Sequence, residues 1–243
     1  MMDSLLSIMD ETPHAAAQIS KPAIIKAHDD LYLRIQASSP ISVTRRFIAS
    51  MRRYTAGIVD QLNSESGAER TTNVTTEQML EIRRRSIGVE PCFPLIENAL
   101  RLNLPDAVFE HWTIQEFQRI IIDLVIISND IVSYRKEEAD GNPHNRIAVL
   151  RCTGLTAQQA FDAVGSMLEA RYNDWDVAFA AVPSWGVQID EEVAQYIQAI
   201  KNVAVANINW SFHSERYFGS MTATVKDTLV TDVLADVVVP VAV

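Results

Sequence analysis

The side chains best suited to chemistry lie in residues 128–138, SNDIVSYRKEE. Asn129, Ser133 and Glu137 are spaced at i, i+4 and i+8, and at about 100° per residue they span about 80° of a helix, so they share one face. They offer an amide carbonyl, a hydroxyl and a carboxylate, which are hard oxygen ligands that suit Mg²⁺ better than Zn²⁺. One carboxylate with two neutral oxygens fits a cation that completes its coordination with water and an anionic ligand.

The same stretch breaks a local rule of helix composition. Asn, Asp and Ser are mediocre helix formers, yet here they follow the apolar run IIIDLVIIS at 120–128. A local rule broken inside an otherwise consistent helix is expected at a functional site. The competing interpretation is a helix that leaves the core and becomes solvated, because this spacing also occurs by chance.

Two basic groups stand out in a chain whose formal net charge is −10. Three arginines, 83–85, end a predicted helix just before Gly88, and Arg216 and Tyr217 lie near the end of another. Guanidinium and phenol groups together are suited to binding a diphosphate. Taken singly, each group also fits a solvated or salt-bridged face.

The elements that must position these residues are predicted to be helices. Glycine is scarce, at 8 of 243 residues, and few hairpin-type turns occur, which favours an all-α fold. Apolar periodicity and capping residues predict helices at 1–12, 23–36, 43–62, 75–87, 92–101, 113–138, 156–180 and 189–218. DGNPHN at 140–145 is predicted to be a loop. We expect one domain over 1–243, with a tail at 220–243 of uncertain structure.

Composition also limits the partners and the location. An acidic chain would repel nucleic acid, and no apolar run reaches the roughly 18 residues that stable membrane insertion needs. The N-terminus has no basic region or cleavage site of a signal peptide. Cys92 and Cys152 lack metal-type spacing and are too few for a disulfide scaffold. We expect a cytoplasmic protein with reduced thiols.

Three motifs of this sequence together resemble class I terpene synthases. NDxxSxxKE at 129–137 resembles the family's second metal-binding motif, and RRRSIG at 83–88, followed by a proline, resembles its diphosphate-sensing segment. The pair Arg216-Tyr217, with Trp210 and Ser214 nearby, resembles the C-terminal Arg-Tyr pair of the microbial enzymes. The motifs occur in family order, and NDIVSYRKE, HN at 144–145 and RYFG are most similar to fungal, especially basidiomycete, sesquiterpene cyclases.

The resemblance implies the class I terpenoid synthase helical bundle and a sesquiterpene synthase. The implied reaction is Mg²⁺-dependent ionisation and cyclisation of farnesyl diphosphate or another allylic diphosphate. The resemblance assigns Mg²⁺ binding to Asn129, Ser133 and Glu137. Diphosphate would be bound by Lys136, Arg216 and Tyr217 and sensed by Arg83 or Arg84. The pocket would be lined by Gly88, Phe93, Phe117, Trp210 and Phe212. Arg84 is preferred as the sensor because it lies four residues before Gly88, the expected helix break. Each pocket aromatic also fits a plain core position.

The sequence departs from the family at its first metal motif, an Asp-rich D-(D/E)-x-x-D. The nearest imitations are HDDLYL at 28–33 and MDE at 9–11. We therefore expect a bundle incomplete at the N-terminus, with the chain starting after the Asp-rich helix. Two alternatives remain: a catalytically inactive homologue that binds Mg²⁺ and diphosphate weakly, or a helical interaction protein whose motifs are coincidental.

Overall fold

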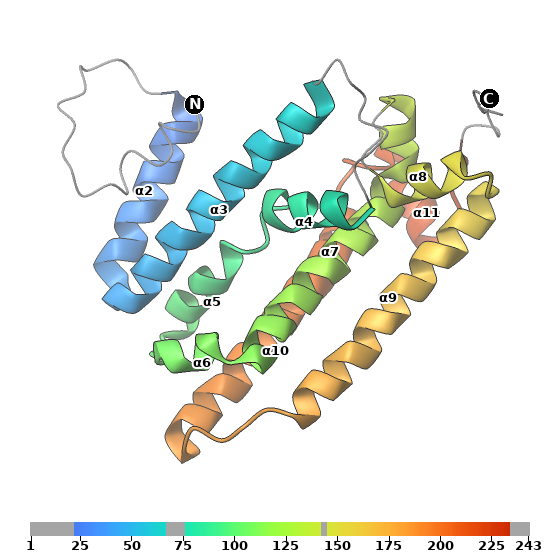
Figure 1. Cartoon of the computed structure of the whole chain (residues 1–243). Coiled ribbons are helices and arrows are strands. Elements are labelled where there is room, and N and C mark those ends of the chain that lie inside the picture. Colours follow the sequence, from blue (N-terminus) through green and yellow to red (C-terminus); the bar gives the residue numbers. More distant parts are fainter. Residues whose placement is uncertain (1–21, 67–75, 142–144, 234–243) are drawn as a thin grey trace. The chain divides into compact units, whose positions relative to one another are not determined.

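A computed structural model of the chain describes residues 22–66, 76–141 and 145–233. Every regular element in these ranges is helical, so the predicted all-α class is confirmed (Figure 1). The chain forms two compact units, Met1–Gln115 with Pro183–Ala199, and Glu116–Val182 with Ile200–Val243. The single domain predicted over 1–243 stays a prediction, and the predicted helix at 1–12 lies outside the described residues.

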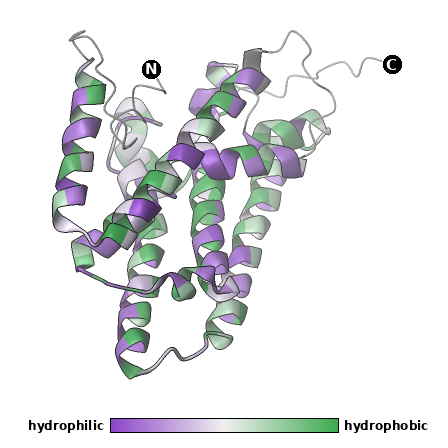
Figure 2. Ribbon diagram, turned by 60° about the vertical axis from the view of Figure 1, so that its left-hand side comes forward, coloured by the Kyte–Doolittle hydropathy of each residue, from purple (hydrophilic) through white to green (hydrophobic). Residues whose placement is uncertain are grey.

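The first unit contains the helices of the N-terminal half. They are α2 (Ala23–Ser38), α3 (Ile41–Ser66), α4 (Thr76–Ser86), α5 (Cys92–Leu100), α6 (Asp106–Glu110) and the first part of α10 (Val187–Ser211). The helices carry apolar and polar residues on different sides, as the mixed colours in Figure 2 show. The apolar sides of α2 and α3 meet in a core cluster of Tyr32, Ile35, Phe47 and Met51, against which Leu95 of α5 packs.

Helix α4 ends where the sequence predicted a break. Its last residue is Ser86, and Gly88 has a φ of +81°, in the left-handed region that favours glycine. A β-carbon at Gly88 would also lie 3.3 Å from the ring of Tyr54 on α3. The break therefore depends both on the backbone freedom of Gly88 and on its close approach to α3.

Gly57 allows α3 to approach the end of α4 closely. A β-carbon at this position would lie 2.5 Å from Cβ of Arg85 and 2.8 Å from the carbonyl carbon of the same residue. The side chain of Arg85 also forms an ion pair with Asp60 on α3, at 2.7 Å. A larger residue at 57 would have to push the two helices apart.

We expect Gly57→Ala to destabilise the protein by about 1–3 kcal/mol, because strain from overpacking exceeds the gain in helix propensity. Urea denaturation followed by circular dichroism measures this change. The matched control is Gly165→Ala on another helix, where an added β-carbon meets nothing within 4 Å. That variant should gain about 0.5–1 kcal/mol. A stabilised Gly57→Ala protein would contradict the close approach.

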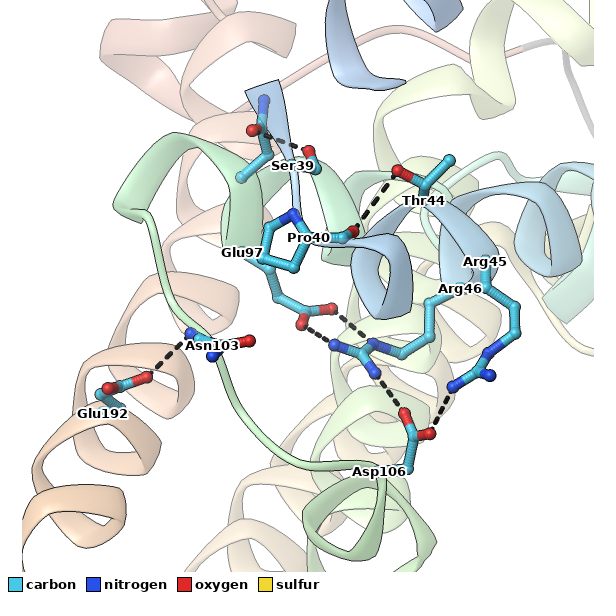
Figure 3. Close-up of polar contacts among 10 residues, drawn as sticks. Ser39, Pro40, Thr44, Arg45, Arg46, Glu97, Asn103, Asp106 and Glu192 are labelled. Atoms are coloured by element: carbon cyan, nitrogen blue, oxygen red, sulfur yellow. Dashed lines mark hydrogen bonds and ion pairs between the residues drawn. The ribbon is translucent and has the colours of Figure 1, made fainter. Parts of the chain in front are cut away.

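A buried ion pair joins α3 to α5 and α6 in the first unit (Figure 3). Arg46 donates from Nε and Nη2 to the two carboxylate oxygens of Glu97, at 3.1 and 2.5 Å. It also donates from Nη1 to Asp106 at 2.6 Å. Its guanidinium carbon also lies 4.1 Å from the ring centroid of Phe109. Glu97 is only 1% exposed, and this burial raises the pKa of its carboxyl group, an effect that the hydrogen bond from Arg46 opposes.

The second unit contains the elements that carry most of the predicted site. They are α7 (Trp112–Ala139) from Glu116 onward, α8 (Arg146–Cys152), α9 (Ala157–Ala180), the end of α10, the 3₁₀ helix η1 (Gly219–Met221) and α11 (Thr222–Thr228). Helix α9 begins with the predicted cap, because the hydroxyl of Thr156 and the side chain of Gln159 form a capping box. The core cluster of Ile127, Tyr134, Ile147, Ala160 and Val164 joins α7, α8 and α9.

The predicted helix at 189–218 was wrong at its end, because α10 stops at Ser211. Phe212 and Phe218 stack with ring centroids 5.8 Å apart. On one continuous helix, residues six apart are separated by about 9 Å along the axis and lie about 120° round it, so they could not stack. Helix α8 was missed, as was α11 in the unassigned tail. Within the described ranges, no helix combines the length and the apolar composition needed to cross a membrane.

Candidate functional site

The last turns of α7 bear the three predicted oxygen ligands Asn129, Ser133 and Glu137, here called the oxygen set. Asn129 and Glu137 are partly buried, while Ser133 is 1% exposed. The Oγ atom of Ser133 is buried and has no hydrogen-bond partner. A buried polar atom without a partner costs about 1–3 kcal/mol, so such an atom requires an explanation. A ligand that binds this hydroxyl would provide one.

Tyr217 lies directly beside Asn129, although 88 residues separate them. The amide nitrogen of Asn129 donates a hydrogen bond to the hydroxyl oxygen of Tyr217 at 2.9 Å. The ring of Tyr217 meets Trp210 edge to face, with centroids 6.0 Å apart, and the guanidinium carbon of Arg216 lies 5.8 Å from the centroid of the Tyr217 ring. The structure thus brings the Arg-Tyr pair and Trp210 to the Asn129 end of the oxygen set.

Glu137, at the other end of the set, contacts a residue for which no role was predicted. Asn145 donates from Nδ2 to Oε2 of Glu137 at 2.9 Å and to the backbone oxygen of Asp130 at 2.8 Å. Asn145 is fully buried and caps α8, because its Oδ1 accepts a hydrogen bond from the backbone nitrogen of Ile147. The available signal was HN at 144–145, which was used only as a family resemblance.

A second polar group holds α8 to α7, next to this contact. Tyr134 donates to Glu138 at 2.6 Å, and Arg151 donates to the hydroxyl of Tyr134 at 2.5 Å and also pairs with Glu138. Burial, together with the hydrogen bond to Glu138, raises the pKa of Tyr134 to about 12. Tyr134 therefore stays protonated at neutral pH and donates to the carboxylate.

The remaining diphosphate candidates have other partners. Lys136 pairs with Asp140 at 2.6 Å on the exposed surface. Arg84 belongs to the first unit, where it pairs with Glu77 and Glu81 of its own helix at 3.3 and 3.2 Å. The roles of Lys136 and Arg84 toward a diphosphate stay predictions.

The predicted pocket residues are placed in their own units. Phe93 is buried in the first unit, which also contains Gly88. In the second unit Phe117 is fully buried against Trp175, with ring centroids 4.5 Å apart, and Phe212 packs with Phe218 and Val132. These contacts agree with the core interpretation, and a common pocket stays a prediction.

The described residues contain no cluster of charged or sulfur ligands that competes with the oxygen set on α7. Across the described parts of the chain, no group of three or more His, Cys, Asp or Glu side chains is arranged to hold a metal ion. Two of the three residues of the oxygen set, Asn129 and Ser133, are neutral. The oxygen set remains the candidate metal centre.

Comparison with known proteins finds one family and many relatives. Residues 1–174 match the family model described as terpene synthase family 2, C-terminal metal binding. Terpene cyclase 4 of Gibberella fujikuroi is 34% identical over 81% of this chain and 53% of its own length. Silphinene synthase peniA of Penicillium patulum is 32% identical over 90% of this chain and 56% of its own length. Sesquiterpene synthase Agr1 of Cyclocybe aegerita is 33% identical, over 93% and 65% respectively. This chain thus spans little more than half the length of the first two of these relatives.

Solved structures match at lower identity. A structure titled a-eudesmol synthase superposes with a TM-score of 0.75 at 22% identity, covering 88% of this chain and 69% of the other. Linalool/nerolidol synthase from Streptomyces clavuligerus has a TM-score of 0.75 at 20% identity, covering 86% and 72%. At these identities the likeness establishes the fold, and the predicted class I terpenoid synthase architecture is confirmed.

Proposed function

We propose, because the chain belongs to terpene synthase family 2, that it acts as a sesquiterpene synthase, in the Mg²⁺-dependent ionisation and cyclisation of farnesyl diphosphate. The observation that carries this proposal is the contact of Asn129 with Tyr217, which joins the oxygen set on α7 to the Arg-Tyr pair. An Mg²⁺–diphosphate needs oxygen ligands on one side and cationic or hydroxyl donors on the other. Curated relatives that are named sesquiterpene synthases support the choice of a fifteen-carbon substrate.

The residues present fit a magnesium ion. The unpartnered hydroxyl of Ser133 would gain a ligand, and Asn129 and Glu137 would supply a carbonyl oxygen and a carboxylate. A single carboxylate in this set leaves the bound cation with positive charge for an anionic substrate. When bound, the cation supplies charge that stabilises the diphosphate group as its bond to carbon breaks.

Tyr217 and Arg216 would bind the diphosphate from the other side. The hydroxyl oxygen of Tyr217 accepts a hydrogen bond from Asn129, so the hydroxyl proton of Tyr217 is available to donate to a diphosphate oxygen. The exposed guanidinium of Arg216 can offer two parallel hydrogen bonds to the same group. Lys136 could join them by leaving Asp140, because an exposed ion pair contributes only about 0–1 kcal/mol. A sensing role of Arg84, which belongs to the first unit, stays a prediction.

Aromatic faces would direct the carbocation once the diphosphate has left. Trp210 is 49% exposed and stands edge to face with Tyr217, so its ring lies next to the diphosphate donors. An aromatic face stabilises a nearby cation by its quadrupole. Phe117 and Phe212, which belong to the same unit as Trp210, would shape part of the remaining apolar wall, and the roles of Phe93 and Gly88 stay predictions.

The second candidate is a homologue that binds Mg²⁺ and diphosphate without turnover. It is favoured by the absence of a D-(D/E)-x-x-D motif from this sequence, since the carboxylates of that motif would hold further cations. Incubating the chain with farnesyl diphosphate and Mg²⁺, with volatile products identified by gas chromatography and mass spectrometry, separates the two. We expect cyclic sesquiterpenes that disappear when EDTA is added. Diphosphate binding without any product would support the second candidate instead.

A further inference from the structure

Polar contacts join both ends of α8 to the ligand-bearing turns of α7. Asn145 bonds to Glu137 and to the backbone of Asp130 at its N-terminal end. Arg151 bonds to Tyr134 and Glu138 toward its C-terminal end. Only the first of these contacts reaches a residue of the oxygen set.

The side chain of Asn145 is itself held in one orientation. It is fully buried, and each of its polar atoms has a partner: Oδ1 accepts from the backbone of Ile147, while Nδ2 donates to Asp130 and to Glu137. A planar amide with three bonds of this kind cannot rotate without losing a buried hydrogen bond, and each loss costs about 1–3 kcal/mol. The hydrogen bond to Glu137 is therefore made by a rigid donor.

We infer that Asn145 is a positioning residue that holds the carboxylate of Glu137 in the orientation required for the cation. This inference rests on the proposed function. A glutamate side chain has three rotatable bonds, and fixing Oε2 removes much of that freedom before the cation binds. Carboxylates that bind metals are in turn hydrogen-bonded, and these partners orient the ligand.

Asn145→Ser removes the hydrogen-bond donor to Glu137 while keeping a side chain that can cap α8. Serine is also a good N-cap residue, so it can accept from the backbone of Ile147, but it lacks the amide that reaches Glu137. Protein-associated Mn²⁺ is measured by equilibrium dialysis of the full chain against Mn²⁺ and inorganic diphosphate. We expect the apparent Kd for Mn²⁺ to rise by about 10- to 100-fold.

The matched control is Arg151→Met, which removes the polar contacts at the C-terminal end of α8. Arg151 contacts Tyr134 and Glu138, which are not among the three oxygen ligands. Thermal unfolding shows how far each substitution loosens the fold, and dialysis is run well below both melting temperatures. We expect Arg151→Met to lower the Tm with an unchanged Kd for Mn²⁺. An equal rise in Kd for both variants would overturn the inference, because Asn145 would then act only through the stability of α8.

Glu137→Gln distinguishes a failure of this inference from a failure of the proposed function. If Glu137→Gln weakens Mn²⁺ binding and Asn145→Ser does not, the positioning role is wrong and the metal site stands. If Glu137→Gln binds Mn²⁺ as tightly as the unchanged chain, Glu137 holds no cation. The positioning role of Asn145 and the proposed metal site would then both be wrong. Weakening by Glu137→Gln and by Asn145→Ser, with Arg151→Met unaffected, supports both.

Discussion

Replacing Glu137 with glutamine is expected to lower kcat for farnesyl diphosphate with Mg²⁺ by about 100- to 1,000-fold. In the proposed function Glu137 supplies the negative charge of the oxygen set on α7, and its loss would weaken the binding of the cation that stabilises the leaving group. A transition state that loses about 3–4 kcal/mol of such stabilisation reacts slower by this factor. Steady-state release of diphosphate measures kcat directly. Glutamine keeps the shape of the side chain and an oxygen to accept from Asn145, so the local fold should persist.

Glu138→Gln is the control on the neighbouring residue. Glu138 is bound to Tyr134 and Arg151 and takes no part in the oxygen set. We expect this variant to melt at a lower temperature and to keep its kcat within about threefold. A Glu137→Gln enzyme that turned over as fast as the Glu138→Gln enzyme would remove the metal role from Glu137.

Arg46→Met is expected to lower the free energy of unfolding by about 3–5 kcal/mol, a large part of the roughly 5–15 kcal/mol that holds a typical domain folded. The substitution leaves the carboxylate of Glu97 buried at 1% exposure without its cation. Burial already raises the pKa of this carboxyl group, so the ionised form is costly there even with Arg46 present. Guanidinium denaturation followed by circular dichroism measures the loss.

Two further variants test whether the unpaired charge is the cause. Arg46→Met combined with Glu97→Leu should recover much of the stability, because replacing both members of a buried pair by apolar residues is often neutral. Arg45→Met breaks an exposed pair with the same Asp106 and should cost only about 0–1 kcal/mol. An equal cost for Arg45→Met and Arg46→Met would contradict the importance of burial.

Local sequence determined α7, the start of α9 and the shared face of the oxygen set. The apolar spacing before Asn129 predicted α7, and on that helix the 3.6-residue period places Asn129, Ser133 and Glu137 together whatever surrounds them. Thr156 determined the start of α9 because its hydroxyl satisfies the first backbone nitrogens of the helix. These properties depend on residues within a few positions of each other, so a single sequence contains them.

Only the tertiary structure decided which partners those residues meet. The pairing of Asn129 with Tyr217 joins residues 88 positions apart, and no local pattern encodes that distance. Asn145 is the last residue of the loop predicted at 140–145, yet packing buries it completely and turns its amide toward Glu137. The burial of Ser133 without a partner likewise depends on what packs around α7. Local rules act along one helix, whereas burial and long-range hydrogen bonds arise when separate helices pack. For that reason the sequence predicted the shared face of Asn129, Ser133 and Glu137 but not the contact of Asn145 with Glu137.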